Sequence, residues 1–461
     1  MRHLRPTLLA VALAAGFTAS FPAVAQTSNE QILQELRALR DRVNQLEAKL
    51  KAAEAKPPAQ AQWGMTPEQS AEFNRIAIKA ESMQDSFTDQ GFKGLVISGM
   101  LDPTYLWTNT RGGSFAFLNG FSGNGGDFSY PDDGFGYDNS YFGQAMLDLQ
   151  KETEDGTRWR LTLAPQKNAS SGYNVGSIVH EASVSLELTD NQTRLWLGQI
   201  PDWSGYEYAW SHQQPLITHN LLFDFTLPSF YTGAALDITR GKWWTRVFLG
   251  NMNASRFDRD NKADVLAYRV DYSKGEFDGW GFAGVHGKSF GQRIDTLEVD
   301  GYYIRGDWTL QGQVAWGRIR DGAANGDAEW AGLSGLVGYN FTPRLKGTLR
   351  ADYVKNDKNG GGIFGSVPAC ADEDCNVLIA DGRNGFGPAM VFDGSEWVAE
   401  PSGKGLNRHA VSLGLNYLYG LNTTFKVEYR LDGASGDAFI GQNGNYRKTN
   451  HLFGTSVVVT F

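Results

Sequence analysis

From Phe92 to the end of the chain, apolar and polar side chains alternate with a period of two, which is the period of a β-strand. Residues 158–164, 345–353 and 425–432 each place apolar side chains on one face and mostly charged or hydroxyl side chains on the other. The composition agrees, because 55 glycines and 13% aromatic residues in 461 residues indicate a large β protein and not a disulfide scaffold. We therefore predict an all-β chain.

The connections between these segments decide the architecture. Tight turns recur at every second junction, for example at 154–156 and 240–241, and we expect long Gly-rich loops at the others. A β-sandwich alternates too but has no reason for this asymmetry. An antiparallel transmembrane β-barrel has it, with strands of roughly 9 to 11 residues. We predict such a barrel over 92–461, with about sixteen strands and with 14 or 18 also compatible. The expected strands are 93–107, 140–153, 157–167, 179–189, 193–200, 230–240, 242–251, 264–273, 278–288, 296–306, 308–318, 330–341, 344–354, 408–419, 422–432 and 450–461.

The N-terminus has the three parts of a secretory signal peptide. Arg2 and Arg5 give a basic start, residues 8–17 form an apolar stretch too short to span a bilayer, and residues 23–25 form a small-residue cleavage site. We expect residues 1–25 to be removed after export. The net formal charge of −9 argues against a nucleic-acid-binding surface.

Residues 26–55 follow a helical period instead. Their apolar positions are spaced alternately four and three apart, which predicts a coiled coil, with a single amphipathic helix as the alternative. Residues 56–65 form a Pro-rich linker, since proline cannot continue a helix. A short helical segment is expected over 66–91, with Thr66 as N-cap. The predicted coiled-coil seam is Ile32, Leu36, Leu39, Val43, Leu46 and Leu50.

The last expected strand ends the chain on a phenylalanine. Its alternate residues Phe453, Val457, Val459 and Phe461 form a lipid-compatible face. This pattern resembles the C-terminal signal by which Gram-negative outer-membrane proteins are recognised by the barrel-assembly machinery.

A further local pattern lies at residues 197–200 (LGQI), 205–207 (GYE), 221–223 (LLF) and 228–233 (PSFYTG). With these motifs and the order signal peptide, coil, linker and barrel, the chain resembles Gram-negative outer-membrane porins, particularly the families named putative β-barrel porins and more distantly the phosphate-selective porins. The resemblance implies a homotrimer in outer-membrane lipid, with the N-terminal segment in the periplasm.

The face opposite the apolar one carries both signs of charge in balance. A phosphate-selective pore would need an excess of Arg and Lys, so phosphate selectivity is not expected. The charges either separate along the bore or pair across neighbouring strands. The expected lumen charges are Arg158, Arg160, Arg246, Arg269, Lys346, Arg350, Lys426 and Arg430, with Asp148, Glu181, Glu187, Asp237, Asp271, Asp352, Glu428 and Asp432.

Residues 201–229 form the third long loop. In general porins the third loop narrows the channel, so the resemblance makes this loop the constriction candidate. Its aromatic and polar side chains suit a sugar. Alternatively, they form an interfacial girdle or pack the loop onto the wall. The candidate residues are Asp202, Trp203, Tyr206, Glu207, Tyr208, Trp210, His212, His219 and Asp224.

Two cysteines, Cys370 and Cys375, lie in the longest expected loop, 355–407. In an exported protein this pair predicts a small disulfide at the loop tip. The acidic residues 372–374 between them more readily form a solvated tip than a metal site. We expect neither a metal nor a cofactor.

These features together predict a passive outer-membrane pore for small hydrophilic solutes. One alternative is an envelope tether that acts through the coiled coil, and a less favoured one is an outer-membrane enzyme. A polar lumen favours the pore, because an anchor could be a smaller, filled barrel. No motif groups a histidine with a nucleophile, so we do not expect an enzyme.

Overall fold

The structure is a computed structural model with two compact units, Met1–Lys93 and Gly94–Phe461. The structure describes residues 40–45, 47–49, 51, 72–79, 82, 93–110, 135–137, 144–164, 178–253, 264–289, 291–323, 326–356, 361–363, 368–370, 378–380, 387–400, 404–441 and 443–461.

In the first unit, the described residues from 40 to 82 are helical and Lys93 lies in a turn. Val43 lies in the first helical stretch and is exposed, while the other five residues of the predicted seam lie outside the described residues. The predicted signal peptide and the linker also lie outside the described residues. Because only one residue of the seam is described, the coiled coil stays a prediction. Among the described residues, no helix is long and apolar enough to cross a membrane.

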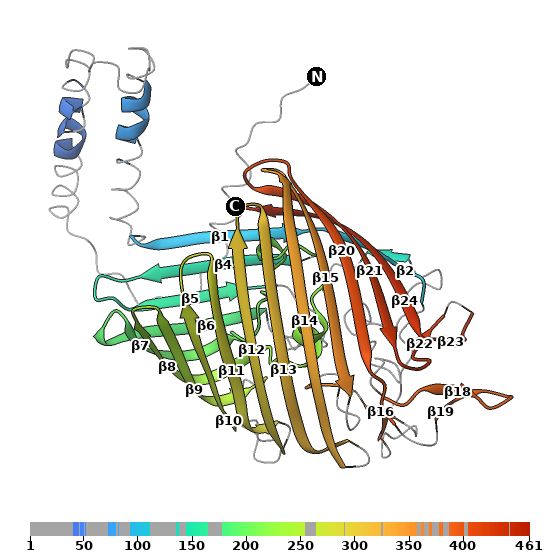
Figure 1. Ribbon diagram of the computed structural model, residues 1–461. Coiled ribbons are helices and arrows are strands. Elements are labelled where there is room, and N and C mark those ends of the chain that lie inside the picture. The colour runs from blue at the N-terminus through green and yellow to red at the C-terminus, as the bar shows by residue number, and fades with distance from the viewer. Residues whose placement is uncertain are drawn as a thin grey trace, which may run out of the picture. The chain divides into compact units, whose positions relative to one another are not determined.

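The second unit is a closed, antiparallel β-barrel whose strands follow one another in chain order (Figure 1). The described residues give sixteen wall positions, with β1 and β2 sharing one position and β3 and β4 sharing the next. This confirms the predicted architecture. The wall strands are β1 (Leu95–Asp102), β2 (Thr104–Thr108), β3 (Phe135–Tyr137), β4 (Gln144–Glu152), β5 (Arg158–Leu163), β6 (Val179–Asp190), β7 (Thr193–Pro201), β8 (Phe230–Arg240), β9 (Trp243–Met252), β10 (Asp264–Ser273), β11 (Asp278–Ser289), β12 (Gln292–Arg305), β13 (Trp308–Ala323), β14 (Gly326–Thr342), β15 (Leu345–Asn356), β20 (Arg408–Leu418), β21 (Thr423–Ala434) and β24 (Thr449–Thr460).

The barrel closes where β24 pairs with both β1 and β2. Pro103 separates β1 from β2, consistent with a residue that has no backbone N–H to give to a ladder. Gly99 and Phe461 exchange two backbone hydrogen bonds of 3.0 and 3.1 Å. The Phe461 ring lies over Gly99, where any side chain would collide with it.

The loop asymmetry predicted from sequence is wrong at two junctions. Strands β11 and β12 pair as far as Ser289 and Gln292, and β13 and β14 as far as Ala323 and Gly326, so both hairpins end in tight turns where long loops were expected. The ladders of β12, β13 and β14 continue over 14, 16 and 17 residues, so the connection only has to reverse the chain. Short hairpins occupy parts of the remaining connections, namely β16 (Pro368–Cys370) with β17 (Leu378–Ala380), β18 (Met390–Phe392) with β19 (Trp397–Ala399), and β22 (Phe439–Ile440) with β23 (Tyr446–Arg447).

Burial in this barrel is inverted relative to a water-soluble protein. Val314 is 62% exposed and Leu413 58%, whereas Arg350 and Glu428 are fully buried. Exposed aromatic side chains such as Trp243, at the turn end of the wall, flank this apolar surface. An apolar outer band with aromatic edges is what a lipid bilayer requires of a β-barrel.

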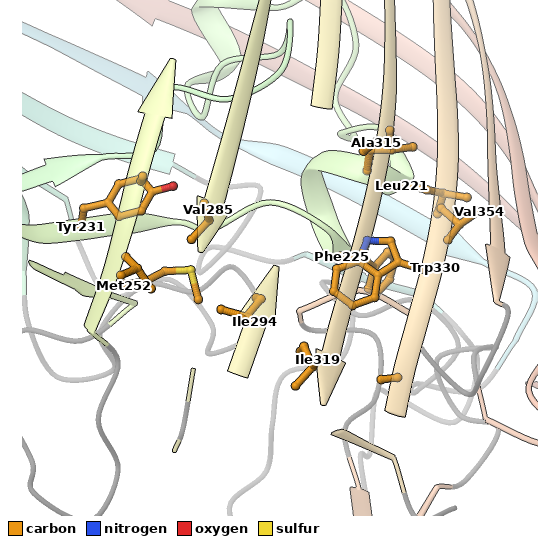
Figure 2. Packing of buried hydrophobic residues seen from close by; sticks show 14 of the residues in the cluster. Leu221, Phe225, Tyr231, Met252, Val285, Ile294, Ala315, Ile319, Trp330 and Val354 are labelled. Atoms are coloured by element: carbon orange, nitrogen blue, oxygen red, sulfur yellow. The ribbon is translucent and has the colours of Figure 1, made fainter. Parts of the chain in front are cut away.

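A smaller apolar cluster lies inside the barrel. Figure 2 shows Leu221 and Phe225 of the short helix α4 (Leu221–Phe225) beside Trp330 of β14 and Val354 of β15. These side chains are all fully buried. The cluster therefore fixes part of the connection between β7 and β8 against the inner wall.

Candidate functional site

Residues 202–229, here called the inner loop, connect β7 to β8 within the barrel. The loop is closed at its base, where Asp202 N–H donates to Ser229 O at 3.0 Å. It contains a 3-10 turn, η3 (Ser211–Gln213), and helix α4. Asn220 caps α4, because its side-chain oxygen accepts from Phe223 N–H at 2.8 Å.

Strand β21 holds the middle of the inner loop. Glu428 accepts hydrogen bonds from the backbone N–H groups of Ile217 and Thr218 at 2.7 and 2.8 Å and from the Thr218 hydroxyl at 2.6 Å. Two residues before it, Lys426 donates to the carbonyls of Ser211 and Gln214. Both side chains are buried, so their charges are satisfied by the loop backbone instead of by water.

Two arginines extend this attachment. Arg350 of β15 donates to the carboxylate of Glu207 at 2.9 Å and to the carbonyls of Thr218 and His219 at 2.7 and 2.8 Å. Arg430 of β21 donates to the same His219 carbonyl at 2.6 Å. Five N–H donors on a planar group allow an arginine to hold several carbonyls at once.

The first residues of the inner loop contact other strands. Gly205 N–H donates to Glu298 of β12 at 2.6 Å, and the Tyr206 hydroxyl bonds with Ser334 of β14 at 2.6 Å. His212 approaches Met100 of β1, with 3.1 Å between Nδ1 and Sδ. The loop is therefore attached to several sides of the barrel.

The loop acids lie in surroundings that favour their neutral form. Burial raises the pKa of Asp202 to about 6, although hydrogen bonds from Ser204 act in the opposite direction. Burial also raises the pKa of Glu207, against the opposing charge of Arg350. The pKa of Asp224 is raised well above its usual value by burial, and neither of its carboxylate oxygens accepts a hydrogen bond from a described residue.

An aromatic cluster joins the start of the inner loop to the wall. Trp203 stacks on Tyr231 with ring centroids 4.4 Å apart, and Tyr231 lies 5.0 Å from Phe248. The Phe248 ring lies over Gly233 and Gly250, where a Cβ atom would come within 3.0 Å of it. Glycine at these two inward positions therefore makes room for the cluster.

The guanidinium of Arg246 lies among three indole rings. It is 5.1, 5.0 and 5.1 Å from the ring centroids of Trp196, Trp203 and Trp244, within the range of cation–π contacts. It also donates two hydrogen bonds of 2.6 Å to Asp237. These contacts fix the orientation of all three tryptophans.

A cavity of about 880 Å³ separates the beginning of the inner loop from the wall formed by β5 to β13. Trp196, Trp203 and Trp244 line it together with Arg160, Arg246 and Arg269. The middle of the inner loop is bound to the other wall, at β15 and β21. Among the described residues, this cavity thus lies on the side of the lumen away from the loop's attachments to β15 and β21.

The comparison with protein families decides the relationship. Residues 95–461 match the model of the family described as "Putative beta-barrel porin-2, OmpL-like". The chain belongs to this family. The resemblance to outer-membrane porins stated from the sequence is therefore confirmed, and the barrel described above is an outer-membrane barrel of the porin type.

Solved structures similar to this porin are also outer-membrane proteins. A loop L8 deletion mutant of OmpT from Vibrio cholerae is 12% identical and covers 80% of this chain and 99% of its own, with a TM-score of 0.48. The anion-selective porin from Comamonas acidovorans is 11% identical with the same coverage and a TM-score of 0.49. The outer-membrane channel DcaP of Acinetobacter baumannii is 9% identical, with 80% and 97% coverage and a TM-score of 0.48. Such values carry no argument about function. No curated protein matches the chain.

In this porin the charges predicted for the lumen are arranged mainly as ion pairs, some between neighbouring strands and some between residues two apart on one strand. Arg160 contacts Asp148 at 2.9 Å and Glu181 at 3.5 Å, and Arg269 contacts Asp271 at 2.7 Å. The other pairs are Arg158 with Glu152, Glu187 with Arg194, Arg246 with Asp237, Arg350 with Asp352, and Arg430 with Asp432, while Lys346 donates to Thr309.

The loop residues named from sequence occupy different positions. Tyr208 is 59% exposed, whereas Trp210 is buried and meets His180 edge to face at 4.6 Å. His219 stacks on Phe223 at 4.0 Å and lies 4.0 Å from Asp224. The remaining candidates are in the loop contacts given above.

Several residues of the site were not predicted. Glu298 and Asp300 alternate with Leu297 and Val299, so the period of two could have placed them in the lumen. The same signal applies to Arg194, which bonds with Ser185 and Glu187. Trp196 and Trp244 could also have been found by this alternation.

The described residues bear only partly on the predicted disulfide and on the expected absence of a metal. Cys370 ends β16, and Cys375 lies outside the described residues, so the disulfide stays a prediction. No group of three or more His, Cys, Asp or Glu side chains is placed to hold a metal ion within the described part of the chain.

Proposed function

We propose that the protein is a water-filled outer-membrane channel for the passive diffusion of small hydrophilic solutes or ions. The observation that carries this proposal is the cavity of about 880 Å³ between the inner loop and the charged wall of the barrel. A lumen lined by paired charges and aromatic edges is polar enough to hold water. The porin family of the chain supports the same role.

The inner loop is the constriction in this proposal. Its buried bonds to Arg350, Lys426, Glu428 and Arg430 hold it in the lumen, so that solutes pass along the opposite wall. We further propose that residues 26–55 form a periplasmic coiled coil and that the channel is a homotrimer. The heptad seam supports both, because a parallel three-stranded coil would join three barrels.

Planar-bilayer recording tests the channel. Purified, folded protein is added to a bilayer under a KCl gradient, and the current steps and the reversal potential are measured. We expect stable currents in groups of three steps. Folded protein that inserts into the bilayer without conducting would contradict the proposal.

A further inference from the structure

We propose that Trp196, Trp244 and the adjoining ion pairs form a binding subsite for a neutral, sugar-sized polyhydroxylated solute. This inference rests on the proposed channel function and specifies the solute class. It comes from four observations on the cavity, namely its size, its aromatic surfaces, their rigidity and the sign of the surrounding charge.

The size of the cavity suits a mono- or disaccharide. Its volume of about 880 Å³ falls in the usual range of about 300 to 1,000 Å³ for small-molecule sites. A site for a single inorganic ion has no need of such a volume.

The indole rings supply apolar surface in a polar passage. Trp196 and Trp244 are inward-facing, half-buried residues of β7 and β9, and both line the cavity. Apolar surface left in contact with water is unfavourable, and a flat solute face that stacks on it removes that contact. Sugar rings present such a face on their C–H side.

The platform is already fixed before any solute arrives. Arg246 contacts both rings at 5.1 Å and is itself held by two hydrogen bonds to Asp237. Rotamers that are fixed in advance lose little entropy on binding. Trp203, by contrast, stacks on Tyr231 and serves mainly to hold the loop.

The surrounding charges favour a neutral solute. Each of the three arginines in the described lining already has a carboxylate partner, so an anion would have to compete with that carboxylate. Arg160 and Arg269 are paired with acids. The N–H groups of each arginine that are not used in its ion pair can donate to solute hydroxyls, and the carboxylate oxygens of its partner can accept from them. Arg246 already supplies the cation for both indoles.

Sugar block of the ion current tests the subsite. Maltose is titrated against the KCl current of the full-length channel, with mannitol as an open-chain polyol that has no ring face. We expect maltose to reduce the current in a saturable way and mannitol to have a much weaker effect. For Trp244→Leu we expect the half-blocking maltose concentration to rise about two- to tenfold, the range given by the loss of one stacking contact.

Trp243→Leu is the matched control, because Trp243 precedes Trp244 on β9, is exposed on the opposite face of the strand and is not among the residues that line the cavity. It should leave the block unchanged, and Trp244→Phe should largely preserve it. If Trp244→Leu does not fold, Trp196→Leu tests the same platform.

Three results would overturn the subsite. They are KCl currents without maltose block, an equal block in the Trp244→Leu and Trp243→Leu channels, and block by tetraethylammonium but not by maltose. In each of these cases the channel itself still conducts. Loss of the KCl current from the unmodified protein would instead contradict the channel function.

Discussion

At the scale of single residues, the contribution of an arginine to the stability of the fold depends on how deeply it is buried. Arg350 is fully buried between Glu207 and Asp352, whereas Arg240 forms an exposed pair with Asp190 at the end of β8. We expect Arg350→Met to lower the free energy of unfolding by about 3–5 kcal/mol, because it leaves buried carboxylates without a counter-charge. Arg240→Met should cost less than about 1 kcal/mol. Urea unfolding in lipid vesicles, followed by tryptophan fluorescence, measures both, and equal losses would contradict the assigned role of Arg350.

The charge of Asp202 gives a pH dependence. Burial raises its pKa to about 6, so the carboxyl group is ionised at pH 8 and mostly protonated at pH 4.5. Because Asp202 lines the cavity, we expect the permeability of K⁺ relative to Cl⁻ to fall as the pH decreases through about 6. Reversal potentials under a KCl gradient measure this. The Asp202→Asn channel should be less cation-selective than the unmodified channel at pH 8. It should also lose most of the change in reversal potential near pH 6.

A turn residue provides the control for this pH experiment. Hydrogen bonds from Thr153 and Thr157 lower the pKa of Asp155, so this group stays ionised over the same pH range. Asp155→Asn should keep the step near pH 6. A step of unchanged size in the Asp202→Asn channel would assign the titration to another group.

At the scale of elements, the proposed constriction can be tested by removing the inner loop. Its ends are joined by the bond between Asp202 N–H and Ser229 O, so residues 203–228 can be replaced by a short Gly-Ser linker. We expect the single-channel conductance to rise at least about twofold, because current follows the open cross-section. Shortening the exposed tip of the β18–β19 hairpin, at residues 393–396, should not change it. An unaltered conductance after replacement of the loop would contradict its role as the constriction.

The strands and the loop contacts differ in how well the sequence predicts them. A period of two is a local signal, and it placed every wall strand except β3 near its observed position, including β21 with Lys426, Glu428 and Arg430 on one face. The partners of these residues have no such signal. Arg350 and Glu207 are 143 residues apart, and their meeting depends on how the loop turns inside the closed barrel. The tight turn between β11 and β12 was missed because its strands continue beyond the length that a membrane requires.

At the scale of the whole molecule, the chain divides into two compact units, Met1–Lys93 and Gly94–Phe461. Unit Gly94–Phe461 has its own closed hydrogen-bond network, so we expect a chain lacking residues 26–64 to fold and to conduct. Conductance per step should be unchanged, whereas the current steps should no longer occur in threes if the coiled coil holds the trimer. Bilayer recording and native electrophoresis measure these two properties. A shortened chain that inserts but does not conduct would contradict the separation.

The bond between Gly99 and Phe461 also has a kinetic consequence. It joins β1 to the residue that follows β24, so the ring of strands closes only after all the wall strands have been synthesised and aligned. Contacts between such distant residues are slow to form, because the intervening chain must first be ordered. Until then β1 and β24 present unpaired backbone edges, which a bilayer cannot hydrate. Closure at this seam is thus the step that removes the last unpaired strand edges from contact with lipid.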